Sequence, residues 1–244
     1  TASAGTSNVR IGVNAGNSIA SGGNYNVVVG DEAGTAITTG DNNTAVGYAA
    51  LDANTTALNN TAVGYASLGA NTTASNNTAV GTSALLANTT GDSNVAVGKS
   101  ALTANTTAAD NTAVGRSALL ANTTGASNTA VGKDALLANT TADNNTAVGY
   151  TAGAAVTTGI RNTLIGSEAG DAITTGANNV AVGALALTAD TLGSKSVAIG
   201  RGALRDQNFT SATDSHNIAV GYSAGQSVTT GVNNTIVGGL AGDA

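Results

Sequence analysis

A short pattern of apolar and polar positions recurs along the whole chain. Its centre is Asn-Thr-Ala-Val-Gly, and the closing glycine, here termed the register glycine, returns mostly every 17 residues. One early step is 18 residues and one late step is 21. A unit this short cannot hold its own core, so the copies must stack as the rungs of a solenoid. The fourteen register glycines are Gly12, Gly30, Gly47, Gly64, Gly81, Gly98, Gly115, Gly132, Gly149, Gly166, Gly183, Gly200, Gly221 and Gly238.

The three residues before each register glycine predict a short β-strand. The last is Val or Ile, and the residue two positions earlier is Val, Thr or Ile. Because side chains alternate across a strand, we expect these two to face the solenoid interior. The residue between them is mostly Ala, which we interpret as a second buried face packed against another chain. This predicts a homotrimer through Ala45, Ala62, Ala79, Ala96, Ala113, Ala130 and Ala147.

A second apolar segment follows each register glycine. The fourth residue after it is Leu or Gly, and the seventh changes with it: Leu51 precedes polar Asn54, whereas Gly34 precedes Ile37. Close packing predicts that the two alternatives fill one cavity from opposite ends. Each rung is therefore expected to hold two short strands around a narrow core.

Two polar columns are expected to run from rung to rung. The residue four before the register glycine is Asn in all copies but one, where Ser196 replaces it. At a strand spacing of about 4.8 Å, stacked amides can form a hydrogen-bonded ladder. A Thr-Thr pair such as Thr55-Thr56 forms a similar column. We interpret the resulting Asn-x-Thr sequons as structural positions, not as glycosylation sites.

The composition excludes several function classes. Cysteine is absent and there is one histidine, so thiol chemistry, disulfides and His- or Cys-rich metal sites are excluded. Eight basic residues and a net charge of −6 argue against nucleic acid. No apolar stretch is long enough for a membrane span. The acids form no recurring site, and phosphate-loop and GxSxG motifs are missing. We therefore expect no catalytic, cofactor-binding or metal-binding residues and no enzyme activity.

Ser196-Val197-Ala198-Ile199-Gly200, followed by Ala203, resembles the repeat of YadA-type trimeric adhesin heads. The NTAVGYxAL form is similar to repeats of phage-like tail-fibre proteins. The resemblance spans essentially the whole chain and implies a left-handed parallel β-roll, three chains about one axis, and a fibre or adhesive role outside the cell. The predicted fold is thus an all-β, trimeric β-solenoid, with residues 1–244 as a single repeat domain of about fourteen 17-residue rungs.

Two surface features are candidate contact sites. The residue after the register glycine carries Tyr or a cation in many rungs, which suggests a stripe that contacts glycans or an anionic cell surface; a solvated edge is the alternative. The 21-residue rung, with the only Phe and the only His, is the second feature. The candidate residues are Tyr48, Tyr65, Lys99, Arg116, Lys133, Tyr150, Phe209 and His216.

The pattern favours a non-enzymatic structural or adhesive fibre protein that is extracellular, on a cell surface or on a virion. A surface filament is the alternative, because the terminal half-rungs complement each other and suggest head-to-tail self-association. An ice-binding solenoid is a further alternative, although the adjacent threonines do not form a Thr-x-Thr grid. A polysaccharide-cleaving solenoid, which would release reducing sugars, is the least favoured class.

Overall fold

The computed structural model describes residues 5–243. They belong to two compact units, Thr1–Thr124 and Gly125–Ala244. Each unit is a parallel β-solenoid of stacked rungs, and residues 5–243 contain no helix. The predicted all-β solenoid with a 17-residue spacing is confirmed.

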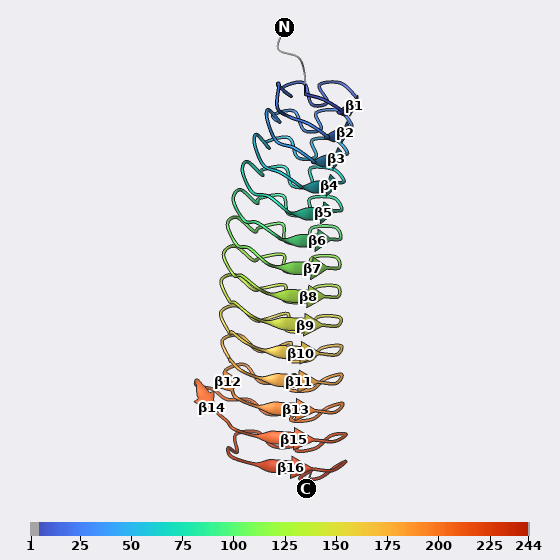
Figure 1. Ribbon diagram of the computed structural model, residues 1–244. Coiled ribbons are helices and arrows are strands. Elements are labelled where there is room, and N and C mark those ends of the chain that lie inside the picture. The colour runs from blue at the N-terminus through green and yellow to red at the C-terminus, as the bar shows by residue number, and fades with distance from the viewer. Residues whose placement is uncertain (1–4, 244) are drawn as a thin grey trace. The chain divides into compact units, whose positions relative to one another are not determined.

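In the first unit, one strand per rung pairs in parallel with the strand of the next rung (Figure 1). Equivalent positions lie opposite one another, so that Ala45 pairs with Ala62 and Ala62 with Ala79. The strands are β1 (Val9–Ile11), β2 (Val27–Val29), β3 (Thr44–Val46), β4 (Thr61–Val63), β5 (Thr78–Val80), β6 (Val95–Val97) and β7 (Thr112–Val114).

The second unit repeats this arrangement and adds a small outlying pair of strands. β12 (Gly193–Ser194) and β14 (Thr213–Asp214) pair with each other in parallel, apart from the main stack (Figure 1). The 21-residue rung supplies β14. The stacked strands are β8 (Thr129–Val131), β9 (Thr146–Val148), β10 (Thr163–Ile165), β11 (Val180–Val182), β13 (Val197–Ile199), β15 (Ile218–Val220) and β16 (Thr235–Val237).

The strands face the opposite way from the prediction. In β3 the central Ala45 is fully buried within the single chain, whereas Thr44 and Val46 are only half-buried. Because neighbours along a strand point to opposite faces, the alanines line the interior and the Thr and Val side chains point outward. An interface through the alanines is therefore wrong, since each is 0% exposed in its own solenoid: Ala45, Ala62, Ala79, Ala96, Ala113, Ala130 and Ala147.

The narrow interior explains why the central strand residue is small. Where it is larger, as in Val28, the rung has glycine as the fourth residue after the register glycine. A Cβ on Gly34 would lie 2.7 Å from Val28 and 2.8 Å from Ile37. A Cβ on Gly170 would likewise lie 2.7 Å from Leu164. The predicted exchange of Leu for Gly is confirmed, and the central strand residue is a third partner in it.

The expected second strand does not form. Ala49 and Leu51 have φ angles of 49° and 54°, so this segment is a series of left-handed turns. Ala50 and Leu51 are neighbours and both fully buried, whereas a strand with one face on the core would bury only every second residue. The turns still bond from rung to rung, because the Leu51 amide donates to the Ser67 carbonyl at 3.0 Å.

The predicted asparagine ladder is confirmed, and a second ladder accompanies it. The backbone N–H of Asn43 donates to Asn26 Oδ1 at 2.9 Å, and the side-chain Nδ2 of Asn43 donates to the Ala57 carbonyl at 2.9 Å. In the other ladder, Asn71 Nδ2 donates to Asn54 Oδ1 at 3.1 Å. These buried amides satisfy one another along the solenoid, which removes the cost of burying polar groups in so thin a core.

The two threonines of the Thr-Thr pair have different roles. Thr38 Oγ1 donates to the Thr55 carbonyl of the next rung at 3.0 Å, and Thr55 Oγ1 donates to that of Thr72 at 3.2 Å. Thr39 and Thr56, the second members of their pairs, are exposed. The first threonine thus forms the expected column, whereas the second belongs to the surface.

Candidate functional site

The residue after each register glycine forms the predicted outer stripe, here termed the Tyr–cation column. In the first unit its members on consecutive rungs are all exposed. The Tyr48 and Tyr65 rings stack with centroids 5.6 Å apart and planes inclined by 15°. The exposed members of the first unit are Val13 and Asp31 on its first two rungs, followed by Tyr48, Tyr65, Thr82, Lys99 and Arg116.

In the second unit the cations of this column contact the tyrosine of the next rung. Lys133 Nζ lies 5.0 Å from the Tyr150 ring centroid and 3.3 Å from Asp134 Oδ2. Arg201 lies 5.9 Å from the Tyr222 ring centroid. These pairs stabilise the column itself, because each cation lies over the face of an aromatic ring.

This arrangement determines what the tyrosines can offer a ligand. Tyr48 and Tyr65 turn ring faces toward each other, and Tyr150 turns a face toward Lys133. These tyrosines remain 50–57% exposed. One face of each of these rings is thus occupied within the protein, which leaves fewer ring faces on which a sugar or base could stack.

The prediction that Phe209 is a surface contact is wrong. Phe209 is 5% exposed, and its ring lies against the Gly193 backbone, where a Cβ would come within 2.8 Å of it. In a chain with so few aromatic residues, the ring fills the extra space that the longer rung creates. His216 is exposed, as expected.

A buried polar network fixes the longer rung to the solenoid. Asp190 and Gln207 occupy the position of the second asparagine ladder and are fully buried. Gln207 Nε2 donates to Asp190 Oδ2 at 2.6 Å and to Ser196 Oγ at 2.8 Å. Ser196 and Ser215 join through their hydroxyl oxygens at 2.5 Å, and Asn217 Nδ2 donates to Gln207 Oε1 at 2.8 Å. The network replaces the regular ladder where the insertion interrupts it.

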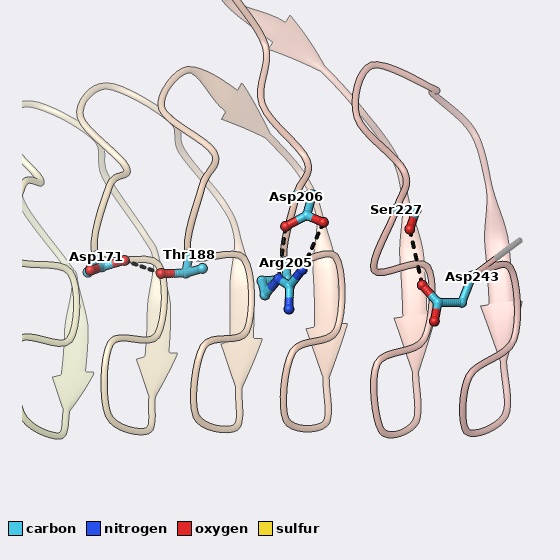
Figure 2. A network of polar contacts seen from close by, with 6 residues as sticks. All are labelled: Asp171, Thr188, Arg205, Asp206, Ser227 and Asp243. Carbon is cyan, nitrogen blue, oxygen red and sulfur yellow. Dashed lines mark hydrogen bonds and ion pairs between the residues drawn. The ribbon is translucent and has the colours of Figure 1, made fainter.

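Exposed polar contacts also connect rungs on another side of the second unit. Figure 2 shows Thr188 donating to Asp171 of the preceding rung, and Ser227 donating to Asp243 at 3.1 Å. Arg205 Nε lies 2.8 Å from Asp206 Oδ1, and this hydrogen bond raises the pKa of Arg205. All of these partners belong to the protein itself, which indicates a stabilising role.

Residues 5–243 form no pocket and no cluster of His, Asp or Glu that could hold a metal ion. None of the elements described above is an apolar helix able to cross a bilayer. The surfaces available for contact are therefore extended faces.

Partial burial raises the pKa of Asp52, and the nearby Glu32 carboxylate acts in the same direction.

The outward strand face is the surface that the sequence analysis missed. In the first unit it carries one column of mainly Thr and one of Val, here termed the Thr/Val face. The second unit continues the pattern with exposed Ile165, Ile199 and Ile218. The pairing of large central residues with glycine, as at Val28 and Gly34, could have revealed which face is buried. The columns of the first unit are Val9, Val27, Thr44, Thr61, Thr78, Val95 and Thr112, and Ile11, Val29, Val46, Val63, Val80, Val97 and Val114.

Comparison of the chain with models of known protein families and with curated protein sequences gives no match.

The outlying strands should respond to acid. Lys195 Nζ lies 2.6 Å from Asp214 Oδ2, and this hydrogen bond lowers the pKa of Asp214. A carboxyl whose pKa is lower in the folded state stabilises that state above its unfolded pKa, and the contribution is lost as the pH falls through the folded value. Both side chains are exposed, so we expect a small, local effect. The protection factors of residues 209–216, which correct for the slower intrinsic amide exchange in acid, should fall below about pH 4, and Asp214→Asn should show low protection already at neutral pH. Equal exchange in both proteins at neutral pH would contradict this.

Proposed function

We propose that the protein is a non-enzymatic structural or adhesive fibre protein that acts outside the cell, on a cell surface or on a virion. The observation that carries this proposal is the Thr/Val face. It is a row of branched side chains, half-buried at best, repeated on one rung after another. Soluble monomers rarely expose a continuous apolar stripe of this kind, so it marks an interaction surface.

The partner that best fits this surface is a second and third copy of the chain. Each rung presents the same pair of side chains at the same spacing, so parallel copies offer matched columns to one another. Covering the valines would remove apolar area from water, which favours association. The proposed trimer therefore forms through the Thr/Val face, and the alanines remain inside each solenoid.

Light scattering after gel filtration tests this association. We expect a species of three times the 23.2 kDa chain mass. Val63→Lys with Val97→Lys should reduce it to the single-chain mass, because two desolvated charges would oppose the interface. Thr56→Lys with Thr90→Lys, on exposed surface threonines, is the matched control and should leave the mass unchanged.

The other outcomes are equally informative. A wild-type mass of 23.2 kDa would overturn the trimer. A mass that grows with concentration would replace it with the head-to-tail filament. Equal loss of association in both pairs of variants would show that the Thr/Val face is not the interface.

Ice binding is a second candidate, favoured by one observation. Within the described residues, the hydroxyls of Thr44, Thr61 and Thr78 make no hydrogen bond, unlike the bonded hydroxyl of Thr38. The outward strand threonines thus form a regular column of uncommitted hydroxyls and methyls beside the valines. Such a face could order water only if the chain remains monomeric. Thermal hysteresis of a monomeric fraction would support this candidate, and its absence would exclude it.

A further inference from the structure

The first unit carries an uninterrupted row of hydrogen-bond donors on its surface. In five consecutive rungs the Tyr–cation column presents a phenol, a phenol, a hydroxyl, an ammonium and a guanidinium, all exposed. The following position in the same rungs holds only Ala or Ser, so neither column contains a carboxylate there. The donors are Tyr48, Tyr65, Thr82, Lys99 and Arg116, and the residues that follow them are Ala49, Ala66, Ser83, Ser100 and Ser117.

Two of these donors are cations without a partner. Among the described residues, the side chains of Lys99 and Arg116 make no ion pair, hydrogen bond or ring contact. In the second unit, by contrast, Lys133, Lys195 and Arg205 each lie within 3.3 Å of a carboxylate oxygen. Like charges on adjacent rungs, about 4.8 Å apart, repel each other. A bound anion would remove that repulsion.

We propose that this row of donors binds an acidic polysaccharide lying along the stack of rungs. Lys99 and Arg116 would contact anionic groups on consecutive sugars, and Thr82 and the tyrosine hydroxyls would contact sugar hydroxyls. The inference rests on the proposed role as an adhesive fibre and names its ligand class.

The spacing and the chemistry of the row both favour this ligand. A sugar in an extended chain advances by nearly the distance between rungs, about 4.8 Å, so one residue can lie against each rung. The guanidinium of Arg116 can bind a carboxylate or sulfate through two parallel hydrogen bonds. Tyr48 and Tyr65 stack on each other and offer hydroxyls, which suits a sugar better than a nucleobase.

The surrounding charges give the site a polarity. Asp52 belongs to the rung of Tyr48, and Glu32 to the rung before it, so the tyrosine end of the row is acidic. Anionic groups are therefore expected at Lys99 and Arg116, and neutral parts of the chain at the tyrosines. The net charge of −6 repels duplex nucleic acid, which carries one charge per about 1.7 Å of its axis, more strongly than a polysaccharide with one carboxylate per sugar.

Titration of the full chain with polygalacturonate, followed by calorimetry, tests the proposal. We expect binding that weakens with salt and no binding of fully methyl-esterified polygalacturonate, which lacks the charges. Lys99→Gln with Arg116→Gln should weaken binding about tenfold or more, because two charge-assisted hydrogen bonds are lost. Arg161→Gln with Arg205→Gln removes the same charge elsewhere and should leave the affinity unchanged. Dextran sulfate in parallel shows whether carboxylate or sulfate is the better anion.

A second pair of variants examines the hydroxyls. Tyr48→Phe with Tyr65→Phe keeps the ring stack and should weaken binding about threefold, since neutral hydrogen bonds contribute less than charged ones. Wild-type protein that binds neither polyanion would overturn the proposal. An equal loss of affinity in Lys99→Gln with Arg116→Gln and in Arg161→Gln with Arg205→Gln would also overturn it. Light scattering of the wild-type protein separates this result from the fibre proposal: a wild type that associates normally but binds neither polyanion overturns the ligand class alone.

Discussion

Replacing Gly64 with alanine should destabilise the first unit by about 3 kcal/mol or more. Gly64 has a φ of +135°, a region that side chains other than glycine rarely adopt. A Cβ there would also lie 2.6 Å from the Gly81 carbonyl oxygen of the next rung. The backbones of Gly64 and Gly81 are both hydrogen-bonded, so neither can move away from the added Cβ without breaking those bonds. Chemical denaturation monitored by circular dichroism would measure the loss.

Gly69→Ala is the matched control from the same rung. Its φ is not in the positive region, and the nearest atom to a Cβ is the flexible end of Leu86 at 3.2 Å. Equivalent positions hold Asp52, Leu86 and Thr103 in nearby rungs, so a side chain is accepted there. We expect a change within about 0.5 kcal/mol of wild type. Similar losses for Gly64→Ala and Gly69→Ala would contradict the steric explanation of the register glycine.

The second large effect concerns the exchange of Leu for Gly and of Asn for Ile in the core of a rung. Leu51→Gly removes a fully buried side chain and should cost about 2–4 kcal/mol, less than the cavity alone because glycine relieves the left-handed φ of 54°. Asn54→Ile alone should cost about 2–3 kcal/mol, because it overfills the core beside Leu51 and removes the acceptor for Asn71 Nδ2.

The two changes together should cost less than their sum. The double variant reproduces the Gly34 and Ile37 pair of the neighbouring rung, which has a φ of 56° at Gly34, although it keeps Ala45 where that rung has the larger Val28. We expect it to recover about 2–3 kcal/mol relative to the sum of the single losses. The double-mutant cycle, measured by denaturation, gives this interaction energy. Additive losses would show that Leu and Ile do not compete for one volume.

The asparagine columns show where a sequence pattern is sufficient. An Asn at a constant position in stacked rungs can bond from rung to rung, and it does so through its side-chain oxygen, which accepts from the backbone N–H of the next Asn, as Asn26 does from Asn43. The second ladder through Asn54 and Asn71 was open to the same argument. Its Asn alternates with Ile or Val from rung to rung, so the exchange of core side chains accounts for the same positions and the column does not stand out in the sequence.

The orientation of the strands shows where the pattern was ambiguous. A Thr-Ala-Val strand places either Ala or the Thr and Val on the inside, and hydrophobicity favours Val. The available volume favours Ala on the inside, because the interior of this rung already holds Ala50, Leu51 and two asparagines. The candidate contact residues also divide into those that the pattern predicts correctly and one whose burial depends on the available volume. The exposed column from Tyr48 to Arg116 followed from its position after the glycine, whereas Phe209 is buried because the longer rung opened a space for it.

The sequence by itself determined the solenoid, its 17-residue rung, the strand before each register glycine, one asparagine ladder and the exchange of Leu for Gly. Each of these depends only on what repeats from rung to rung, and a period can be read along one dimension. The tertiary structure alone decided which strand face is interior, that the second segment is turns, and that the insertion buries Phe209. These depend on how much volume opposing segments leave for one another across the rung, which no single column of the repeat specifies.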